Sequence, residues 1–516
     1  MKPRSVGLAA VACGLVTASL LAWVWGSLRS VAVIHDEAAY LLQARIFASG
    51  SWTAAGRPLP EFFEQICVLV TPVLASKYWP GHSLMLVPGI WLGVPGLIPL
   101  LFDAVSGAAL FLLARRLSGT LVALLAWALW LVSPGVLRFL PSYLAQTTTS
   151  VLALLAWGAL WRWLESGDRR WLTALSGLVG LGFITRPFTF LALSLPIAVV
   201  VLKRIRRRGA WRDLRMPMAL AGMILLLIPL WNVRTTGRWA GTPYLLYSRT
   251  YFPYDKPGFG MDPTPPLRRL PPDLQRYDEQ FKENHVGHTI ARLPRLLRER
   301  AVAIAQSVWG DSYPAWIVLA LIGLVSGGGV ARFAAASTAS LVFCYLIEAH
   351  HETWTAYYVE AFPLLAFLSA TGLAKVFLRL EIALARRRSR PVWKPVRAAG
   401  LSVAILAIVV YAFPQAEVER LWKQSRGEDW ARFATLLGRL PPDPAVVFVR
   451  YSPKHDIHHS LVMNVPDLER EHLWIAYDRG DDNARLLRLA PERRAFVYDE
   501  AAHRLIAMPG PSRSRA

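Results

Sequence analysis

Runs of apolar residues alternate with short polar segments over most of the chain, from residue 6 to residue 413. A helix needs about 20 apolar residues to cross a bilayer, and the first run, residues 6–28, is long enough. The later runs that we expect to cross are residues 97–113, 121–132, 147–163, 171–184, 188–202, 216–231, 315–325, 333–347, 356–375 and 399–413. This pattern predicts an all-α polytopic membrane protein with about eleven transmembrane helices, several of them short.

Two long polar segments interrupt the apolar pattern. Residues 29–80 are expected to form a long first outer loop, and residues 232–311 a second long loop. The apolar run at residues 82–91 lies between Pro-Gly pairs. With about 10 residues it is too short to span, so we predict an interfacial helix there.

The basic residues define the two sides of the membrane. The chain carries a net charge of +22, and Lys and Arg cluster between the apolar runs. If residues 82–91 do not cross, every cluster falls on the same side as the N-terminus, which the positive-inside rule identifies as cytoplasmic. These basic positions are Lys2 and Arg4, Arg115 and Arg116, Arg169 and Arg170, residues 203–208, Arg332, and residues 386–388. A continuous basic face is missing, which argues against nucleic acid and leaves membrane lipids as the expected partner.

The end of the chain differs in pattern from the rest. An amphipathic stretch with Trp422 and Phe433 precedes three β-like runs at residues 446–449, 473–477 and 495–498. We therefore predict a transmembrane domain at residues 1–415, a small extracytoplasmic α/β domain at residues 416–510, and a disordered tail at residues 511–516. Three histidines cluster in the small domain, where a solvated loop is the favoured interpretation: His455, His458 and His459.

Polar side chains collect on the outer side of this topology. Asp36 and Glu37 follow directly on the first apolar run, where adjacent carboxylates are costly unless they are solvated or functional. The other residues that the topology places there are Glu61, Glu64, Lys77, Tyr78, His82, Arg138, Tyr143, Gln146, Arg186, Asn232, Arg234, His350, His351, Glu352, Tyr357 and Tyr358. This mixture is what transfer of a sugar from a lipid phosphate requires. A carboxylate takes a proton from the acceptor hydroxyl, and a cation neutralises the departing phosphate.

Several short motifs resemble one known family. Asp36-Glu37-Ala38-Ala39-Tyr40 follows the first helix, and the resemblance continues in residues 60–64, in Lys77-Tyr78-Trp79-Pro80-Gly81-His82, in residues 113–119 and in Arg186-Pro187. Their order and sidedness resemble those of the membrane-embedded C-type glycosyltransferases, which include protein O-mannosyltransferases and the lipid A aminoarabinose transferase. The resemblance covers residues 34–260, with a weaker echo at residues 357–363.

The resemblance implies roles for individual residues. Asp36 would be the general base, with Glu37 supporting it or binding metal, and Lys77 would contact the donor phosphate. Glu61 or Glu64 would contribute to a divalent-metal site, although the turn after Tyr143 lacks an acidic residue that some relatives have there. Further substrate-binding positions would be Tyr78, His82, Arg186, Tyr40, Tyr143, Tyr357 and Tyr358.

The expected function is therefore inverting glycosyl transfer, either hexosyl or pentosyl. The donor would be a polyprenyl-phosphate sugar, and the acceptor an unidentified glycan, lipid or protein hydroxyl on the extracytoplasmic face of a bacterial inner membrane. A polytopic transporter or lipid flippase is one alternative, and a non-catalytic envelope scaffold is another. For single residues there are alternatives as well. Lys77 would be an interfacial lysine that snorkels to the membrane surface, and Glu61 and Glu64 would simply be exposed to solvent.

Overall fold

The computed structural model describes residues 3–26, 32–385 and 393–508. The chain packs into two compact units, each assembled from three stretches of sequence. The helical unit contains Met1–Leu28, Gly96–Leu227 and Ile290–Trp422, and the mixed unit contains Arg29–Pro95, Ile228–Thr289 and Lys423–Ala516. The domain boundary at residue 415 stays a prediction. Three expectations lie outside the described residues: Lys2, the basic positions 386–388, and the tail at 511–516.

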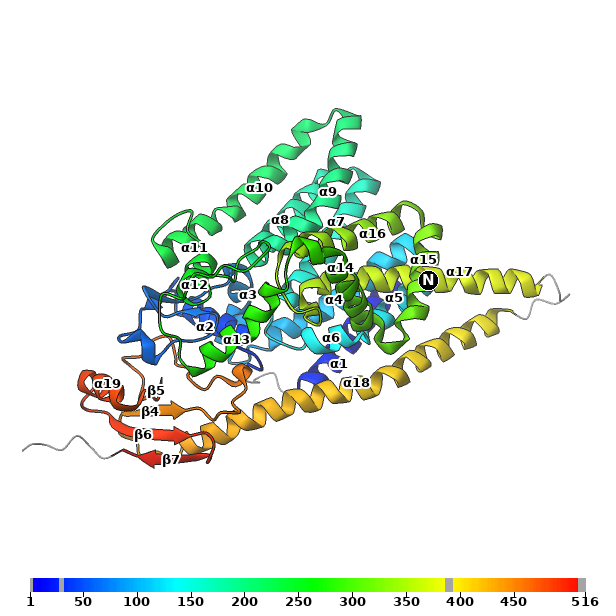
Figure 1. The fold of residues 1–516 in the computed structure, drawn as a ribbon. Coiled ribbons are helices and arrows are strands. Elements are labelled where there is room, and N and C mark those ends of the chain that lie inside the picture. Colours follow the sequence, from blue (N-terminus) through cyan, green and yellow to red (C-terminus); the bar gives the residue numbers. More distant parts are fainter. Residues whose placement is uncertain (1–2, 27–31, 386–392, 509–516) are drawn as a thin grey trace, which may run out of the picture. The chain divides into compact units, whose positions relative to one another are not determined.

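The helical unit is a bundle of long apolar helices joined by short turns (Figure 1). Its α-helices are α1 (Pro3–Trp25), α4 (Leu97–Ser118), α5 (Thr120–Leu131), α6 (Pro134–Phe139), α7 (Gln146–Ser166), α8 (Arg169–Thr185), α9 (Pro187–Arg208), α10 (Arg215–Leu225), α14 (Leu293–Trp309), α15 (Tyr313–Ser326), α16 (Gly328–Cys344) and α17 (Phe362–Ala385). The long helix α18 (Trp393–Leu437) begins in this unit and ends in the mixed unit.

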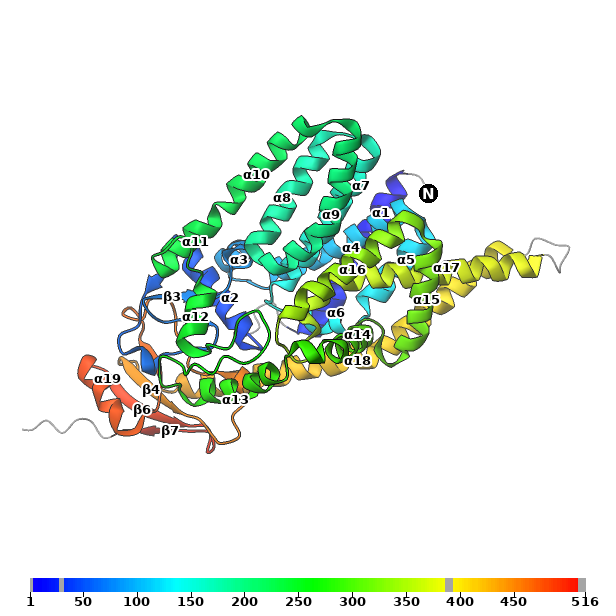
Figure 2. The same cartoon turned by 45° about the horizontal axis from the view of Figure 1, so that its top comes forward.

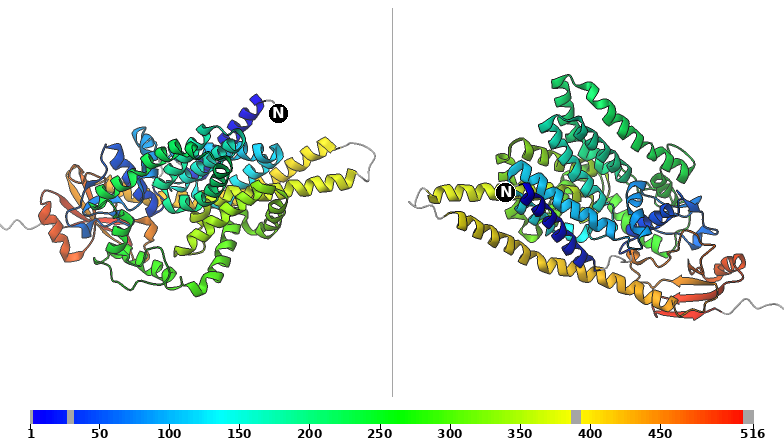
Figure 3. Two further views of the ribbon diagram at one scale, coloured as in Figure 1. Left: turned by 90° about the horizontal axis from the view of Figure 1, so that it is seen from above. Right: turned by 180° about the vertical axis from the view of Figure 1, so that it is seen from behind.

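Small residues allow the helices of this bundle to approach closely. Helix α15 packs along α17, and a Cβ added to Gly323 would lie only 1.9 Å from the Leu368 carbonyl oxygen. A Cβ on Gly372 would lie 1.8 Å from the Leu319 carbonyl oxygen. Such close backbone crossings are typical of helix pairs within membranes. Helices α8, α9 and α10 also run side by side (Figure 2), and α1 packs along α4 (Figure 3, right).

Seven helical segments among the described residues are long and apolar enough to cross a membrane. The polytopic character predicted from the sequence is thus confirmed, whereas the count of about eleven spans is not. Helix α5 has 12 residues and α8 has 17, both short for a span. The predicted span 399–413 lies entirely within α18, where the structure describes the helix but few of the side chains.

The predicted loop at residues 232–311 was wrong in part, because much of this segment is helical. It contains the end of α11 (Leu227–Thr236), then α12 (Pro243–Tyr251), α13 (Pro272–Val286) and α14. Helix α13 is largely polar but buries Leu274 and Tyr277 on one face. An apolar-run criterion overlooks such amphipathic helices because their mean hydropathy is low.

The mixed unit has two small sheets with helices between them in sequence. In the first outer segment, α2 (His35–Ala48) precedes a three-stranded antiparallel sheet in the order β1-β3-β2, and α3 (Pro80–Trp91) follows it. The strands are β1 (Ala54–Ala55), β2 (Val68–Leu69) and β3 (Val73–Ser76). Helix α3 confirms that a short helix forms where the sequence predicted one. Aromatic residues of α12 and α13 pack with α2 and β2 in one apolar core.

The second sheet confirms the three predicted β-runs. Strands β4 (Ala445–Arg450), β5 (Leu473–Tyr477) and β6 (Arg494–Asp499) are parallel, with Val447 opposite both Ile475 and Phe496. A fourth strand, β7 (Arg504–Ala507), pairs antiparallel with β6 and was not predicted (Figure 1). The short helix α19 (Asn483–Leu489) connects β5 and β6, as a parallel connection requires.

Candidate functional site

Asp36 lies in the first turn of α2, within the mixed unit. Asp36 and Glu37 are both in this turn, where the positive end of the helix dipole stabilises negative charge. The two side chains have different surroundings, because Glu37 is only 2% exposed whereas the Asp36 side chain is 28% exposed. Asp36 is therefore the carboxylate of the pair that a substrate can reach.

Two neighbours hold the Asp36 carboxylate through separate oxygens. His35 Nε2 lies 3.1 Å from Asp36 Oδ2, and the Tyr78 hydroxyl donates to Oδ1. Burial raises the pKa of Asp36, but His35, the Tyr78 hydrogen bond and the charge of Lys77 outweigh that effect. The pKa of Asp36 therefore lies well below its ordinary value, and the group is an ionised carboxylate at neutral pH.

A buried ammonium lies in the same cluster. Lys77 Nζ is 3.5 Å from Asp255 Oδ2 and lies 4.9 Å from the ring centroids of both Tyr244 and Tyr247. Burial opposes the charged form, but the carboxylates of Asp255 and Asp36 favour it, and the net effect raises the pKa of Lys77. Removing an ammonium from water costs free energy. Here the carboxylate of Asp255 and the surrounding tyrosine rings offset that cost.

The end of β3 positions Lys77 and Tyr78. The amide side chain of Gln43 accepts a hydrogen bond from the Ser76 backbone at 3.0 Å and donates to the Trp52 carbonyl at 2.9 Å. The Lys77 backbone N–H donates to the Cys67 carbonyl at 2.9 Å. Gln43 thus ties α2 to the strand that carries both site residues.

Cys67 and two aromatic residues complete the surroundings of Tyr78. Burial raises the pKa of the Cys67 thiol to about 12, so this thiol is protonated and donates to the Tyr78 hydroxyl at 3.2 Å. Cys67 also has a φ of 66°, which is uncommon for a residue other than glycine. Tyr40 stacks on Tyr78, with 4.7 Å between their ring centroids, and His82 packs edge-on against Tyr40 at 4.8 Å.

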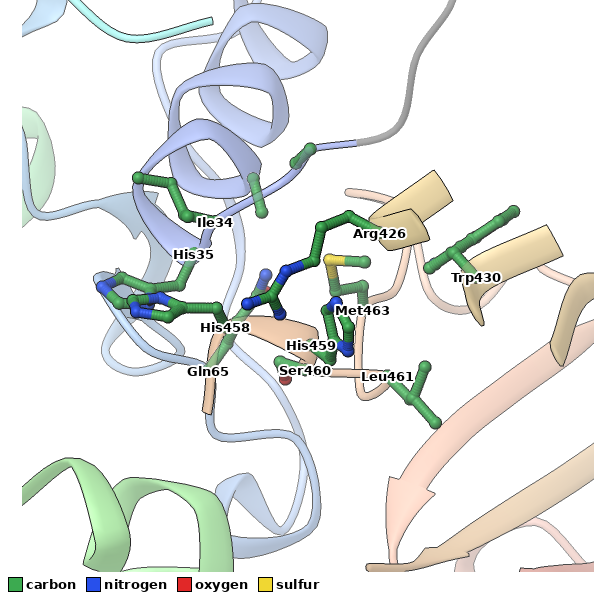
Figure 4. A pocket seen from close by; sticks show the side chains of 12 residues that line it. Ile34, His35, Gln65, Arg426, Trp430, His458, His459, Ser460, Leu461 and Met463 are labelled. Atoms are coloured by element: carbon green, nitrogen blue, oxygen red, sulfur yellow. The ribbon is translucent and has the colours of Figure 1, made fainter. Parts of the chain in front are cut away.

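A pocket opens on the other face of His35, still within the mixed unit (Figure 4). It encloses about 450 Å³ of space that includes open solvent. His458 reaches His35 from the chain segment after β4, with 3.1 Å between their Nδ1 atoms. The residues that line it include His35, Gln65, Arg426, Trp430, His458 and His459.

The solvated loop expected for the three histidines is wrong. The His455 side chain is fully buried and lies 2.7 Å from Glu500, and His458 is half-buried against His35. Burial lowers the pKa of His458 to about 4, so this imidazole is neutral at physiological pH. Sequence spacing did not reveal these partners, because they lie far from the histidines along the chain.

Glu61 and Glu64 each lie beside an arginine of the mixed unit. Glu61 Oε1 is 3.0 Å from Arg485 Nη2, and Glu64 Oε1 is 3.3 Å from Arg268 Nη1. Glu64 is completely buried, which raises its pKa to about 7. A role for either residue as a metal ligand stays a prediction.

A different group in the mixed unit has the donor atoms of a transition-metal site. His35, Asp36 and Cys67 offer ligand atoms that lie within 4.8 Å of one another, and nitrogen, oxygen and sulfur ligands suit zinc. Both oxygens of Asp36 already accept hydrogen bonds, however, and the Lys77 ammonium lies alongside. The cluster therefore fits a cation poorly, and we derive no chemical step through a metal.

The remaining predicted site residues belong to the helical unit. Arg186 directly precedes α9. Its guanidinium lies 3.4 Å from Glu360, 3.3 Å from the Tyr345 hydroxyl and 5.9 Å from the Tyr357 ring centroid. Tyr358 contacts His350 Nε2 at 3.0 Å through its hydroxyl. Tyr143 is fully buried and packs edge-on against Trp25 at 4.9 Å. Arg186, Tyr357 and Tyr358 thus meet around Tyr345, in another unit than the Asp36 cluster.

Two residues of the Asp36 cluster were missed as site residues in the sequence. Asp255 directly follows the aromatic segment Tyr251–Tyr254, and a carboxylate beside aromatic residues is the signal that could have identified it. His35 precedes the acidic pair directly, but its hydrogen bond to Asp36 depends on the geometry of the helix start.

Comparison with solved structures reveals a shared fold. The crystal structure of ArnT from Cupriavidus metallidurans bound to undecaprenyl phosphate matches with a TM-score of 0.54 and 15% identity, over 95% of this chain and 92% of that one. The apo state of the same protein matches with a TM-score of 0.53 and 15% identity, over 94% and 88% of the two chains. An Archaeoglobus fulgidus oligosaccharyltransferase tethered to an acceptor peptide also matches, at 13% identity over 95% and 68%, but its TM-score of 0.44 carries no argument.

No family model and no curated protein matches the chain. At 15% identity the match to ArnT shows the fold alone. It confirms that this chain has the fold of ArnT, over nearly the whole length of both chains.

Proposed function

We propose that this protein is an inverting glycosyltransferase that moves a sugar from a polyprenyl phosphate to an acceptor hydroxyl on the extracytoplasmic face of the membrane. The observation that carries the proposal is the pairing of an ionised, partly exposed Asp36 with the buried ammonium of Lys77 in one cluster. The fold adds support, because ArnT shares it and was solved with undecaprenyl phosphate bound.

Asp36 acts as the general base in the proposed reaction. The acceptor oxygen attacks the anomeric carbon while its proton passes to the Asp36 carboxylate. The bond from the anomeric carbon to the phosphate oxygen breaks, and its electron pair leaves with the polyprenyl phosphate. A single displacement inverts the anomeric centre and requires no covalent enzyme intermediate.

Lys77 stabilises the departing phosphate. Negative charge grows on the phosphate oxygens in the transition state. A cation that is already in place lowers the barrier, because the protein need not rearrange as the charge develops. In the free protein Asp255 neutralises this ammonium at 3.5 Å. A donor phosphate that approaches Lys77 takes over part of that role.

One observation favours the transporter alternative. Asp103 lies inside α4, is completely buried, and has no hydrogen-bond partner for either carboxyl oxygen among the described residues. Acidic side chains within membrane helices often mark ion pathways. A pathway requires a succession of such groups, whereas this acid stands alone in its helix, so we give glycosyl transfer precedence.

The test is donor turnover by the purified full-length protein in lipid nanodiscs. A panel of undecaprenyl-phosphate sugars is supplied with envelope extract as the acceptor source, and release of undecaprenyl phosphate is measured. We expect Asp36→Asn to lower turnover by about 10²- to 10⁴-fold, the usual contribution of a general base.

The matched control is Asp103→Asn, which changes the same chemical group in the helical unit. We expect it to turn over at the wild-type rate. Equal turnover by wild type and Asp36→Asn would remove Asp36 from the mechanism. Absence of donor turnover in the wild type with every sugar of the panel would instead favour the transporter alternative.

A further inference from the structure

We infer that the end of α11 and the turn that follows it form a contact surface for the headgroups of anionic phospholipids. The surface consists of Arg234, Arg238 and Trp239, and we call it the anchor turn. It lies within the mixed unit. The inference does not depend on the proposed function, because it concerns the membrane lipids and no reaction.

Polar side chains on the inner side of the anchor turn hold it in shape. Asn232 is buried, and its side-chain amide donates to the Trp239 carbonyl at 3.0 Å. The Thr236 hydroxyl oxygen lies 2.7 Å from the Gly241 carbonyl oxygen and 2.8 Å from that of Asn232. Gly237 ends the helix with a φ of 73°, in the left-handed region that favours glycine. The turn therefore has one defined conformation before any partner binds.

The side chains on the outer side of the anchor turn are cationic and aromatic. Arg234 and Arg238 are exposed, and Trp239 is 74% exposed. Neither arginine forms an ion pair or a side-chain hydrogen bond with a residue that the structure describes. Guanidinium groups bind phosphate oxygens with two parallel hydrogen bonds, so the complementary partner is a phosphate group.

Apolar residues beside the arginines indicate that this phosphate belongs to a membrane lipid. Leu230 and Val233 are 37% and 45% exposed and lie three positions apart, on one face of α11. They belong to the segment Trp211–Thr236, which is long and apolar enough to cross a membrane. Tryptophan and arginine side chains at the end of such a segment lie at the depth of the lipid headgroups.

Basic residues lie at both ends of this apolar segment. Arg212 and Arg215 are near its start, and Arg234 is near its end. A crossing segment has only one cytoplasmic end, so the positive-inside rule accounts for only one of the two sets of cations. In the predicted topology the anchor turn is at the other end. Binding to the phosphates of the outer leaflet accounts for its arginines.

The anchor turn leads directly into α12, which carries part of the Lys77 cage (Figure 1). The Thr242 side chain caps this helix, and the ring centroids of Tyr244 and Tyr247 each lie 4.9 Å from Lys77 Nζ. A turn that is held at the headgroups therefore keeps this cage near the level of the lipid phosphates. Only the use of that position rests on the proposed function, in which Lys77 binds the phosphate of a lipid-linked sugar.

The test measures which lipids lie next to the anchor turn in the full-length protein. A fluorescent label is attached to Ala240→Cys, an exposed position of the turn, in a Cys344→Ser background, since Cys13 and Cys67 are buried. The nanodiscs contain equal amounts of phosphatidylcholine and phosphatidylglycerol, and only one of the two lipids is brominated in each sample. Bromine quenches the label at close range, so the two samples report the lipid composition at the turn.

We expect brominated phosphatidylglycerol to quench more strongly, because each arginine near an anionic headgroup strengthens binding about fivefold. The double variant Arg234→Gln/Arg238→Gln should remove this preference, whereas Arg234→Lys/Arg238→Lys should keep most of it. The matched control is Arg249→Gln/Arg269→Gln, which removes the same charge from two exposed arginines elsewhere in the mixed unit. It should keep the preference of the wild type.

Three results would overturn the inference. The first is equal quenching by the two brominated lipids in the wild type, and the second is an unchanged preference in the glutamine double variant. The third is an absence of quenching by both lipids, which would place the turn away from the membrane and favour an acidic protein as its partner. Donor turnover by the wild type tests the proposed function separately, since quenching does not require glycosyl transfer.

Discussion

At the scale of single residues, the site is a set of charges that compensate one another. Asp36, Lys77 and Asp255 are all at least partly removed from water, and each has an opposite charge or a donor within the cluster. Removing one partner from such a group leaves a buried charge without compensation, which costs more than the pair itself contributes. If a carboxylate of this cluster is substituted, a bound anion such as the donor phosphate is expected to stabilise the uncompensated ammonium.

Asp255→Asn tests whether Lys77 binds the donor phosphate. We expect the variant to lose about 3 kcal/mol of stability, because the buried ammonium loses its carboxylate. Undecaprenyl phosphate should then raise the melting temperature of the variant by more than that of the wild type, since its anion restores the compensation. Thermal unfolding in nanodiscs with and without this lipid measures both effects.

The control is Asp262→Asn, which alters a partly exposed lysine–aspartate pair with Lys256 in the same segment. It should change neither the stability nor the response to lipid. The same lipid-induced shift in wild type and Asp255→Asn would argue against phosphate binding at Lys77.

Glu64 provides a prediction about pH. Burial raises its pKa from 4.5 to about 7, although Arg268, Arg479 and Glu61 also act on it. The folded protein therefore holds this proton more tightly than the unfolded chain, so stability falls as pH rises from about 4.5 to about 7. The loss contributed by Glu64 amounts to at most about 3 kcal/mol.

We expect Glu64→Gln to remove most of this pH dependence. The measurement is the melting temperature at pH 5 and at pH 8, in the presence of a chelator so that metal binding does not contribute. Glu61→Gln, at the neighbouring glutamate that pairs with Arg485, serves as the control. If the wild type and Glu64→Gln lose the same stability between the two pH values, the buried Glu64 does not carry this proton.

At the scale of elements, short pieces of regular structure position the site. Helix α2 presents Asp36 in its first turn, and β3 ends immediately before Lys77 and Tyr78. Strand β3 has only four residues, so its position depends on side-chain hydrogen bonds more than on its ladder. Gln43 supplies two of these bonds, one to the strand end and one to the Trp52 carbonyl.

Gln43→Leu is therefore expected to displace the end of β3. The buried Ser76 N–H loses its acceptor, which costs about 1–3 kcal/mol. Donor turnover should fall as well, because Lys77 and Tyr78 follow Ser76 directly. Gln275→Leu, at an exposed glutamine of α13, is the control and should leave the melting temperature and turnover unchanged. Wild-type turnover in Gln43→Leu would show that this amide does not position the site.

At the scale of the whole molecule, the helical unit supplies apolar spans and the mixed unit carries the Asp36 cluster. Both kinds of structure alternate along one chain, since each unit is assembled from three separate stretches. The fold shared with ArnT covers 95% of the chain and therefore includes both units. The sidedness predicted from the basic clusters places the mixed unit outside the cytoplasm.

Cysteine labelling tests this sidedness. In bacterial spheroplasts that express the protein, a membrane-impermeant maleimide should react with Ala501→Cys, an exposed position of the C-terminal segment. It should react with Arg207→Cys, at the exposed end of α9, only after permeabilisation. The wild type, in which Cys13 and Cys67 are buried, gives the background. Labelling of Arg207→Cys alone in intact spheroplasts would reverse the predicted orientation.

The amino-acid sequence alone determined the elements whose signal is local. Long apolar runs predicted the polytopic helical character, and short β-like apolar runs predicted β4, β5 and β6. The Asp36-Glu37 pair after the first run indicated the site. Helix α13 and strand β7 escaped prediction because their burial is partial and depends on what packs against them.

Only the tertiary structure decided which side chains meet. Asp255 contacts Lys77 and His458 contacts His35, although the partners are far apart in the sequence. A sequence pattern detects only residues that are close along the chain, so it could predict neither contact. The charge state of Asp36 also depends on these neighbours, because a pKa is determined by burial and nearby charge. The chemistry proposed for this site therefore comes from contacts that form only when the mixed unit folds.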